Sequence, residues 1–215
     1  MVSFLLLLKK LVLYLKSDID KGNTPLEIYQ LCSCIREAFC LSYSIRKSNL
    51  LYLYSQDESI LIKFDGEKLR YLGSDERSQA LLLKKAIDTA KQSKILNDKA
   101  WKKSTPGISV RIFKDNTSFY LFLKSILRKN NFFIIDDDLN SKEEIAISTF
   151  NTKSLININE SLFIMPTYSI SQKNEFFFEL FKKLKNIKYV TLLNVKAVED
   201  KILYINFQID QQINF

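Results

Sequence analysis

The sequence predicts an α/β fold in which a mostly parallel β-sheet is flanked by helices. Short apolar runs typical of buried strands alternate along the chain with segments whose apolar residues recur at helical spacing, and this alternation is typical of parallel sheets. The 215 residues are 47% hydrophobic and 26% charged, which is the composition of a folded protein with its own core. No internal repeat or change of composition marks a boundary, so we expect a single domain over residues 1–215.

The first strand and helix of this alternation are well marked. Residues 2–8 form a continuous apolar run that predicts a fully buried strand. The next helix has a predicted N-cap at Thr24, a first helical residue at Pro25 and a capping-box partner at Glu27. Its apolar stripe consists of Ile28, Leu31, Cys32, Ile35 and Phe39. We therefore expect a helix that packs this stripe onto the sheet.

A hairpin and a second helix are predicted next. The strand-like runs 49–54 and 59–64 flank a turn-prone SQDE segment, which indicates paired neighbouring strands. Ser74 is the expected N-cap of the second helix, with Asp75 and Glu76 favourably placed in its first turn.

The later elements are predicted more simply. Residues 91–109 are polar, basic and interrupted by Pro106 and Gly107, so they are expected to form a loop. The remaining predicted elements are a helix over 119–127, strands over 132–136, 162–165 and 189–193, and a helix over 176–184.

The C-terminal segment carries two conflicting patterns. Val198, Ile202, Ile205 and Ile209 lie at helical spacing, whereas residues 202–209 also alternate as a strand would. Because β-branched and aromatic residues dominate, the local composition favours the strand.

The residue inventory excludes several kinds of chemistry. The chain has no His, which excludes His-based acid–base and nucleophilic catalysis and the usual catalytic zinc sites. Cys32, Cys34 and Cys40 fall in one helical segment, so we expect buried free thiols rather than disulfides or a metal site. The acidic run 136–138 lacks the Gly of a calcium loop and is expected to be a solvated turn. No metal is predicted.

The net charge of +8 and a pI near 9.2 suit a polyanionic partner, either RNA or an anionic membrane surface. The apolar N-terminal run is interrupted by Lys9 and Lys10, and no stretch is long enough to span a bilayer. We therefore expect a soluble, cytoplasmic protein.

Basic and aromatic residues gather in three segments. Arg70, Tyr71 and Arg77 lie beside a predicted helix N-terminus, where they could hold a phosphate or a flipped base or could simply form a charged turn. Arg46 and Lys47 follow the first helix and either complement its dipole or contact phosphates. Trp101 offers a stacking face among Lys94, Lys99, Lys102 and Lys103.

Three segments together resemble a known family. These are CSCIREAFCLSYSIRK (32–47), FDGEKLRYLGSDERSQALLLKKAI (64–87) and STPGISVR (104–111). In content, order and spacing they are similar to the archaeal tRNA pseudouridine-N1 methyltransferases, the TrmY type of the SPOUT class.

The resemblance implies a SPOUT-like fold with a C-terminal trefoil knot, and hence a helix rather than a strand over 202–209. It implies a homodimer that uses S-adenosyl-L-methionine to methylate N1 of a pseudouridine in the T-arm of tRNA, without a metal. The residues that we expect to contact tRNA are Arg36, Arg46, Lys47, Arg70 and Arg77. No catalytic residue is identified.

The cofactor loops depart from the family pattern. The resemblance places the cofactor against Met165, Pro166, Thr167, Leu192, Leu193 and Ile202. Pro166 and Leu193 stand where the family has loop glycines, and Ile202 where it has a Cys. Because glycines let a ligand approach the backbone closely, these changes are expected to crowd the pocket. The alternative is a catalytically inactive SPOUT paralogue that serves as an RNA-binding or interaction module.

Overall fold

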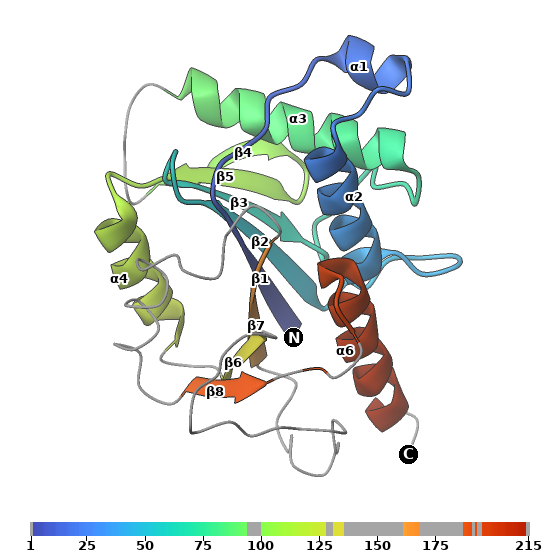
Figure 1. Cartoon of the computed structure of the whole chain (residues 1–215), viewed down its shortest axis with the longest axis vertical. Helices are drawn as coiled ribbons and strands as arrows, with labels where there is room; N and C mark the ends of the chain where they lie inside the picture. The colour runs from blue at the N-terminus through green and yellow to red at the C-terminus, as the bar shows by residue number, and fades with distance from the viewer. Residues whose placement is uncertain are drawn as a thin grey trace.

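The protein is described here from a computed structural model, which covers residues 2–93, 100–127, 131–135, 161–167, 187–190, 192 and 195–213. Figure 1 shows the chain with its elements labelled. In chain order they are β1 (Val2–Leu8), α1 (Lys16–Asp20), α2 (Leu26–Phe39), β2 (Asn49–Ser55), β3 (Ile60–Asp65), α3 (Glu76–Gln92), β4 (Lys102–Thr105), β5 (Ile108–Ile112), α4 (Asn116–Leu127), β6 (Asn131–Ile135), β7 (Ser161–Pro166), β8 (Ile187–Val190) and α6 (Val198–Ile213).

The described strands form one eight-stranded sheet in the order β4-β5-β3-β2-β1-β7-β6-β8. From β2 to β8 all neighbours pair in parallel, whereas β3, β5 and β4 continue the sheet antiparallel at one edge. The predicted α/β class with a mostly parallel sheet is therefore confirmed. The predicted hairpin is confirmed too, as the antiparallel pair of β2 and β3.

Helices cover both faces of the sheet, and β1 runs through its centre. Phe4, Leu6 and Leu8 belong to a hydrophobic cluster shared with α2, α3 and α6, while Leu5 and Leu7 belong to a second cluster shared with α4. This alternation follows from the two-residue period of a strand. Figure 1 accordingly shows α4 on the opposite side of the sheet from α2 and α6.

Two predicted helix starts are wrong by one residue. The N-cap of α2 is Pro25 rather than Thr24, and no side-chain capping bond forms there, so the predicted capping box with Glu27 is absent. Pro25 has an extended ψ of 142° and therefore lies outside the helix. Its carbonyl accepts from the backbone amides of Ile28 and Tyr29. Asp75 rather than Ser74 caps α3, because its carboxylate accepts from the Ser78 amide at 2.8 Å.

The predicted loop over residues 91–109 is also wrong. Its last part forms β4, the turn at Pro106 and Gly107, and the start of β5. The polar composition that suggested a loop is that of an edge strand, which natural sheets protect with charged side chains. Short α1 was not predicted at all.

The C-terminal segment is the helix α6, so the local preference for a strand over 202–209 is wrong, and the helix implied by the resemblance is confirmed. Burial decides between the two patterns. Val198, Ile202, Ile205 and Ile209 are all buried in the cluster that contains α2, and only a helix brings these four side chains to one face.

The helix at 119–127 and the strands at 132–136 and 162–165 are confirmed as α4, β6 and β7. The strand predicted over 189–193 is confirmed in part as β8, which ends at Val190. Residues 191 and 193, the predicted helix over 176–184 and the acidic run 136–138 lie outside the described residues. Among the helices that are described, none combines the length and apolar character needed to cross a bilayer.

Candidate cofactor edge and RNA-binding surface

The parallel strands β1 and β7 end side by side at one edge of the sheet. Leu7 lies opposite Pro166, and Thr167 extends the pairing, since its amide and its hydroxyl both donate to the Leu7 carbonyl at 3.0 Å and 2.9 Å. From β1 the chain goes on to β2 on one side, whereas β8 lies on the other side, beyond β6. Such a switch point, outside the carboxyl ends of the strands, is where open α/β sheets bind ligands.

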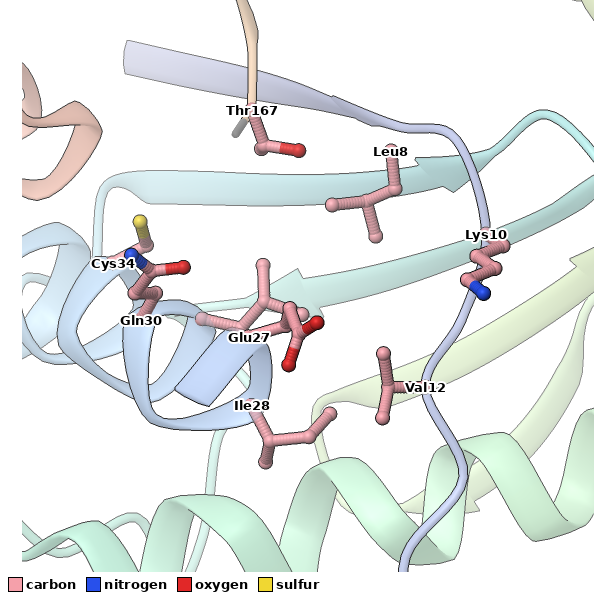
Figure 2. A pocket seen from close by; sticks show the side chains of 9 residues that line it. Leu8, Lys10, Val12, Glu27, Ile28, Gln30, Cys34 and Thr167 are labelled. Atoms are coloured by element: carbon pink, nitrogen blue, oxygen red, sulfur yellow. The ribbon is translucent and has the colours of Figure 1, made fainter. Parts of the chain in front are cut away.

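A small pocket opens at this switch point (Figure 2). Leu8, Lys10 and Val12 come from the end of β1 and the segment after it, Thr167 follows β7, and α2 contributes Glu27, Ile28, Gln30, Leu31 and Cys34. The walls are mainly apolar, with the carboxylate of Glu27, the amide of Gln30 and the ammonium group of Lys10 among the polar ones. In the sequence Glu27 stands only as a candidate for helix capping, and no local signal indicates the pocket.

The pocket does not fit a whole S-adenosyl-L-methionine molecule. Its volume is about 50 Å³. Pockets for ligands of that size measure roughly 300–1,000 Å³. Residues 168–186 and 193–194, which include parts of both predicted cofactor loops, lie outside the described residues.

The structure describes five of the six predicted cofactor residues. Met165, Leu192 and Ile202 are buried in one hydrophobic cluster, and Pro166 is half-buried. Of the predicted six, Thr167 lines the pocket, and Leu193 lies outside the described residues. Their role toward a cofactor stays a prediction.

The thiols of α2 are buried and neutral. Burial raises the pKa of Cys32 to about 12 and that of Cys34 well above its usual value. The prediction of buried free thiols is thus confirmed for this pair, while Cys40 is half-buried. A thiol held neutral is a poor nucleophile, so the Cys34 at the pocket contributes an apolar wall rather than a reactive group.

The GEKLRYLGSDERS segment packs between two turns. The Gly66 amide donates to the Asn49 carbonyl at 3.0 Å, and a Cβ at Gly66 would lie 2.3 Å from the Arg46 carbonyl oxygen. Farther along, the Gly73 amide donates to the Ser78 hydroxyl at 2.8 Å. The first glycine therefore permits a close backbone contact that places this segment directly beside the turn after α2.

The same segment also packs on the turn between β4 and β5. Gly107 has a φ of +82°, and a Cβ there would lie 2.4 Å from the backbone of Leu69. Leu69 is buried, whereas Arg70 and Tyr71 point into solvent, with Tyr71 at a φ of 66° and 82% exposed. Left-handed backbone in a non-glycine residue is costly and is common at binding sites. The segment therefore presents one cation and one aromatic ring on a rigid support.

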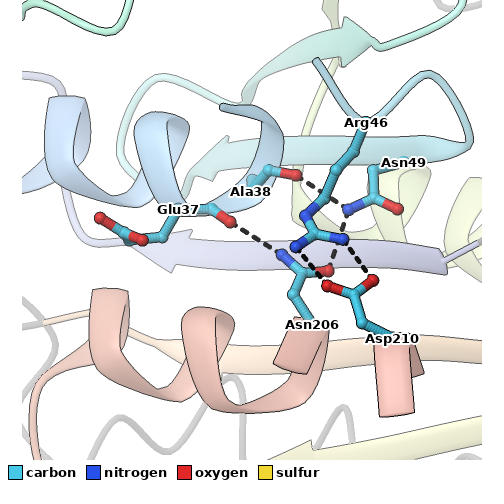
Figure 3. Close-up of polar contacts among 6 residues, drawn as sticks. All are labelled: Glu37, Ala38, Arg46, Asn49, Asn206 and Asp210. Atoms are coloured by element: carbon cyan, nitrogen blue, oxygen red, sulfur yellow. Dashed lines mark hydrogen bonds and ion pairs between the residues drawn. The ribbon is translucent and has the colours of Figure 1, made fainter. Parts of the chain in front are cut away.

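Arg46 is held in a polar cluster between α2, β2 and α6 (Figure 3). Its guanidinium donates to both carboxylate oxygens of Asp210, at 2.6 Å and 2.7 Å, and its side chain is only 15% exposed. Beside it Asn49 donates to the Ala38 carbonyl at 2.8 Å and to the Asn206 side chain at 3.0 Å. The charge of Arg46 is thus neutralised by a partner that the sequence did not suggest.

The other predicted RNA contacts lie on the surface, in two neighbouring segments. Arg36 pairs with Glu37 at 2.9 Å and Arg77 with Asp20 at 2.7 Å, so both cations already have a carboxylate partner. Lys47 and Arg70 are exposed. The structure thus brings the turn after α2 beside the 66–78 segment, and it leaves the RNA contacts themselves as predictions.

Metal ligands are scarce in the part of the chain that the structure describes. It contains no group of three His, Cys, Asp or Glu side chains that could hold an ion.

The chain is similar to known RNA methyltransferases. A family model described as "Putative SAM-dependent RNA methyltransferase" matches residues 18–160. The chain is 38% identical over 101 residues to the tRNA (pseudouridine(54)-N(1))-methyltransferase of Methanocaldococcus jannaschii. The aligned region covers 44% of this chain and 49% of that protein. The enzyme of the same name from Haloferax volcanii is 38% identical over 94 residues, 44% of each chain.

A longer match is found with the Methanococcoides burtonii enzyme of that name, which is 32% identical over 136 residues, 53% of this chain and 64% of the relative. The chain therefore spans about half the length of the first two relatives and less than two thirds of the third. The five predicted RNA contacts lie inside the family match, and the six predicted cofactor residues lie beyond its end at residue 160.

Proposed function

The chain belongs to this family of RNA methyltransferases, and from that membership we propose that it methylates N1 of a pseudouridine in the T-arm of tRNA. The observation that carries the proposal is the family match over residues 18–160, which is well over half of the chain. The names of the relatives support the choice of base and position.

The chemistry asks little of the protein beyond positioning. Methylation replaces the proton on N1, so the site must hold the base against a methyl donor and let that proton leave. In our proposal S-adenosyl-L-methionine supplies the methyl group and no metal takes part. The absence of His is compatible with this reaction, because the proton can pass to another acceptor or to water.

We place the cofactor at the carboxyl edge of the parallel sheet, between residues 163–168 and 191–202. The switch point between β1 and β7 supports this placement, as do the positions of Met165 and Thr167 at the end of β7 beside β1. Since the pocket bounded by the described residues is too small for the whole molecule, we derive no reaction step from it.

We also propose that the protein acts as a homodimer and that its single domain ends in a trefoil knot. The helical state of α6 and its packing on α2 support the knot, because a C-terminal hairpin would be incompatible with one. Exposed Leu203 and Phe207, one turn apart on α6, support a dimer face. With tRNA as the substrate, we propose the cytoplasm as the place of action.

Two measurements on the wild-type protein test the proposed function. Calorimetric titration with S-adenosyl-L-methionine is expected to give a dissociation constant in the micromolar range. Transfer of labelled methyl groups is then measured on a T-arm stem-loop that contains one pseudouridine. The matched control is the same stem-loop with uridine, in which N1 carries the ribose and cannot accept a methyl group.

Methyl transfer to the pseudouridine RNA alone confirms the function. If millimolar cofactor gives no heat while the stem-loop still binds, the chain is the inactive RNA-binding paralogue. Equal labelling of both RNAs would show a methyltransferase with a different target atom.

A further inference from the structure

A wider groove lies away from the carboxyl edge, between β3, the β4–β5 hairpin and the 66–70 segment. Its volume is about 440 Å³, and the lining residues used below are Lys63, Asp65, Arg70, Trp101 and Lys103. Pro106 and Gly107 close one end, where the Arg70 amide donates to the Pro106 carbonyl at 3.4 Å. The hairpin and the 66–70 segment therefore form two fixed walls.

Cationic side chains form a row across this groove. Lys63 on β3 pairs with Ser109 on β5, which pairs in turn with Lys103 on β4, so these three side chains point to the same face of the sheet. Asp65 lies 3.8 Å from the Lys63 ammonium group and 3.4 Å from that of Lys68. The groove is lined by two carboxylates, those of Asp65 and Glu67, and by four cations, so its net charge is positive. The cations are Lys63, Lys68, Arg70 and Lys103.

Trp101 supplies an aromatic face within this row of charges. Its indole packs edge-on against Phe122 of α4, with ring centroids 6.0 Å apart, and this contact fixes the ring. The Lys63 ammonium group lies 5.1 Å from the indole centroid. A fixed aromatic ring within a cationic groove is the arrangement by which proteins hold single-stranded nucleic acid, with a base on the ring and phosphates on the cations.

We propose that this groove binds an unpaired nucleotide of the RNA, whose base stacks on Trp101 and whose phosphates contact Lys63, Lys103 and Arg70. The inference rests on the proposed function for the identity of the RNA, and it adds a contact surface separate from the carboxyl edge of β1 and β7. The sequence already suggested Trp101 with Lys103 as a stacking face among cations, and Arg70 as an RNA contact. It did not suggest Lys63 or the alignment of Lys63 with Lys103, because that register depends on a hairpin that was predicted as a loop.

The experiment uses the intrinsic fluorescence of Trp101, which is the only Trp of the chain. The full chain is titrated with a ten-nucleotide oligouridylate, and we expect saturable quenching as bases stack on the indole. Parallel titrations use uridine monophosphate and a decaglutamate peptide. For both we expect the concentration that gives half-maximal quenching to be at least ten-fold higher than for the oligouridylate. If the peptide quenches as well as the RNA, the groove is a general anion site and the proposal fails.

Variants separate stacking from charge. Because these variants lack the fluorescent Trp, binding is measured from the anisotropy of a dye-labelled oligouridylate. Trp101→Leu is expected to weaken this binding about ten-fold and Trp101→Phe much less, since a base on an aromatic ring contributes this order of affinity. Lys103→Gln is expected to reduce the slope of log affinity against log salt by about 0.7, the value for one phosphate contact on a single strand. Lys85→Gln, an exposed lysine of α3, is the matched control and leaves both quantities unchanged.

Failure of this inference is distinguishable from failure of the proposed function. Methyl transfer without Trp101 quenching, together with wild-type affinity in Trp101→Leu and Lys103→Gln, overturns the groove and leaves the enzyme. Quenching by oligouridylate with the expected variant effects upholds the groove even if no methyl group is transferred.

Discussion

At the residue scale, glycines show what a sequence pattern conveys and what it omits. Gly66 and Gly107 lie in turns, and the family resemblance rests partly on the segment from Gly66 to Gly73. No local rule could indicate that Gly107 contacts Leu69, because the two residues are brought together by a hairpin and a sheet edge. The turn was predictable, whereas the contact that explains the glycine was not.

Gly107 offers a direct test of that contact. Gly107→Ala is expected to lower the free energy of unfolding by about 3 kcal/mol, since it combines left-handed backbone with a clash against the backbone of Leu69. Gly22 is the matched control, because its φ of +71° is similar but nothing lies within 4 Å of the added Cβ. Gly22→Ala should therefore cost only about 1 kcal/mol in the same urea denaturation. Equal losses for the two variants would show that crowding at Gly107 is unimportant.

At the element scale, α6 and the β4–β5 hairpin show where local patterns fail. The last helix has β-branched residues suited to a strand, yet it buries its helical stripe against α2 and fixes its position through Asn206. The hairpin has a composition suited to a loop, yet β5 pairs along β3. In both cases the deciding interactions are with elements distant in sequence, which periodicity does not report.

The position of α6 depends on an asparagine pair. Asn206 is buried, donates to the Glu37 carbonyl at 2.8 Å and accepts from Asn49 at 3.0 Å. Asn206→Ala is expected to lower the free energy of unfolding by about 2 kcal/mol, because it leaves the half-buried Glu37 carbonyl and the buried Asn49 amide less well paired. The exposed Gln211 gives the control, since Gln211→Ala on the same helix should change it by less than about 0.5 kcal/mol.

A double-mutant cycle in urea checks the same contact. Asn49→Ala combined with Asn206→Ala should be less destabilising than the sum of the single variants by about 1 kcal/mol. Strict additivity would mean that the two side chains do not interact, and the placement of α6 against the start of β2 would then need another explanation.

At the scale of the whole molecule, the sequence predicted the class of fold well and the functional regions unevenly. The alternation of elements was enough for the parallel sheet, because apolar runs and helical stripes are local. Predicting the candidate site, by contrast, required knowing which strand ends lie next to each other in the folded sheet, and local patterns do not report this. Thr167, which the resemblance named as a cofactor contact, lines the pocket at the carboxyl edge of β1 and β7. Glu27 lines the same pocket, but only the packing of α2 beside the end of β1 shows this. Arg46, predicted as an RNA contact, forms an ion pair with Asp210 of α6, which the sequence did not indicate, and its role toward RNA stays a prediction.

The proposed homodimer can be tested at the exposed face of α6. Leu203 and Phe207 are 48% and 53% exposed on one face of a helix whose other face is buried, and a self-complementary contact there would remove both from water. Phe207→Glu is therefore expected to convert a dimer into a monomer in sedimentation experiments, with an unchanged far-ultraviolet circular dichroism spectrum. Leu121→Glu is the matched control, because Leu121 is 60% exposed on α4, on the opposite side of the sheet, and its replacement should leave the dimer intact. A wild-type chain that sediments as a monomer at micromolar concentration, or a dimer that withstands Phe207→Glu, would remove α6 as the dimer face, and the two exposed side chains would then need another partner.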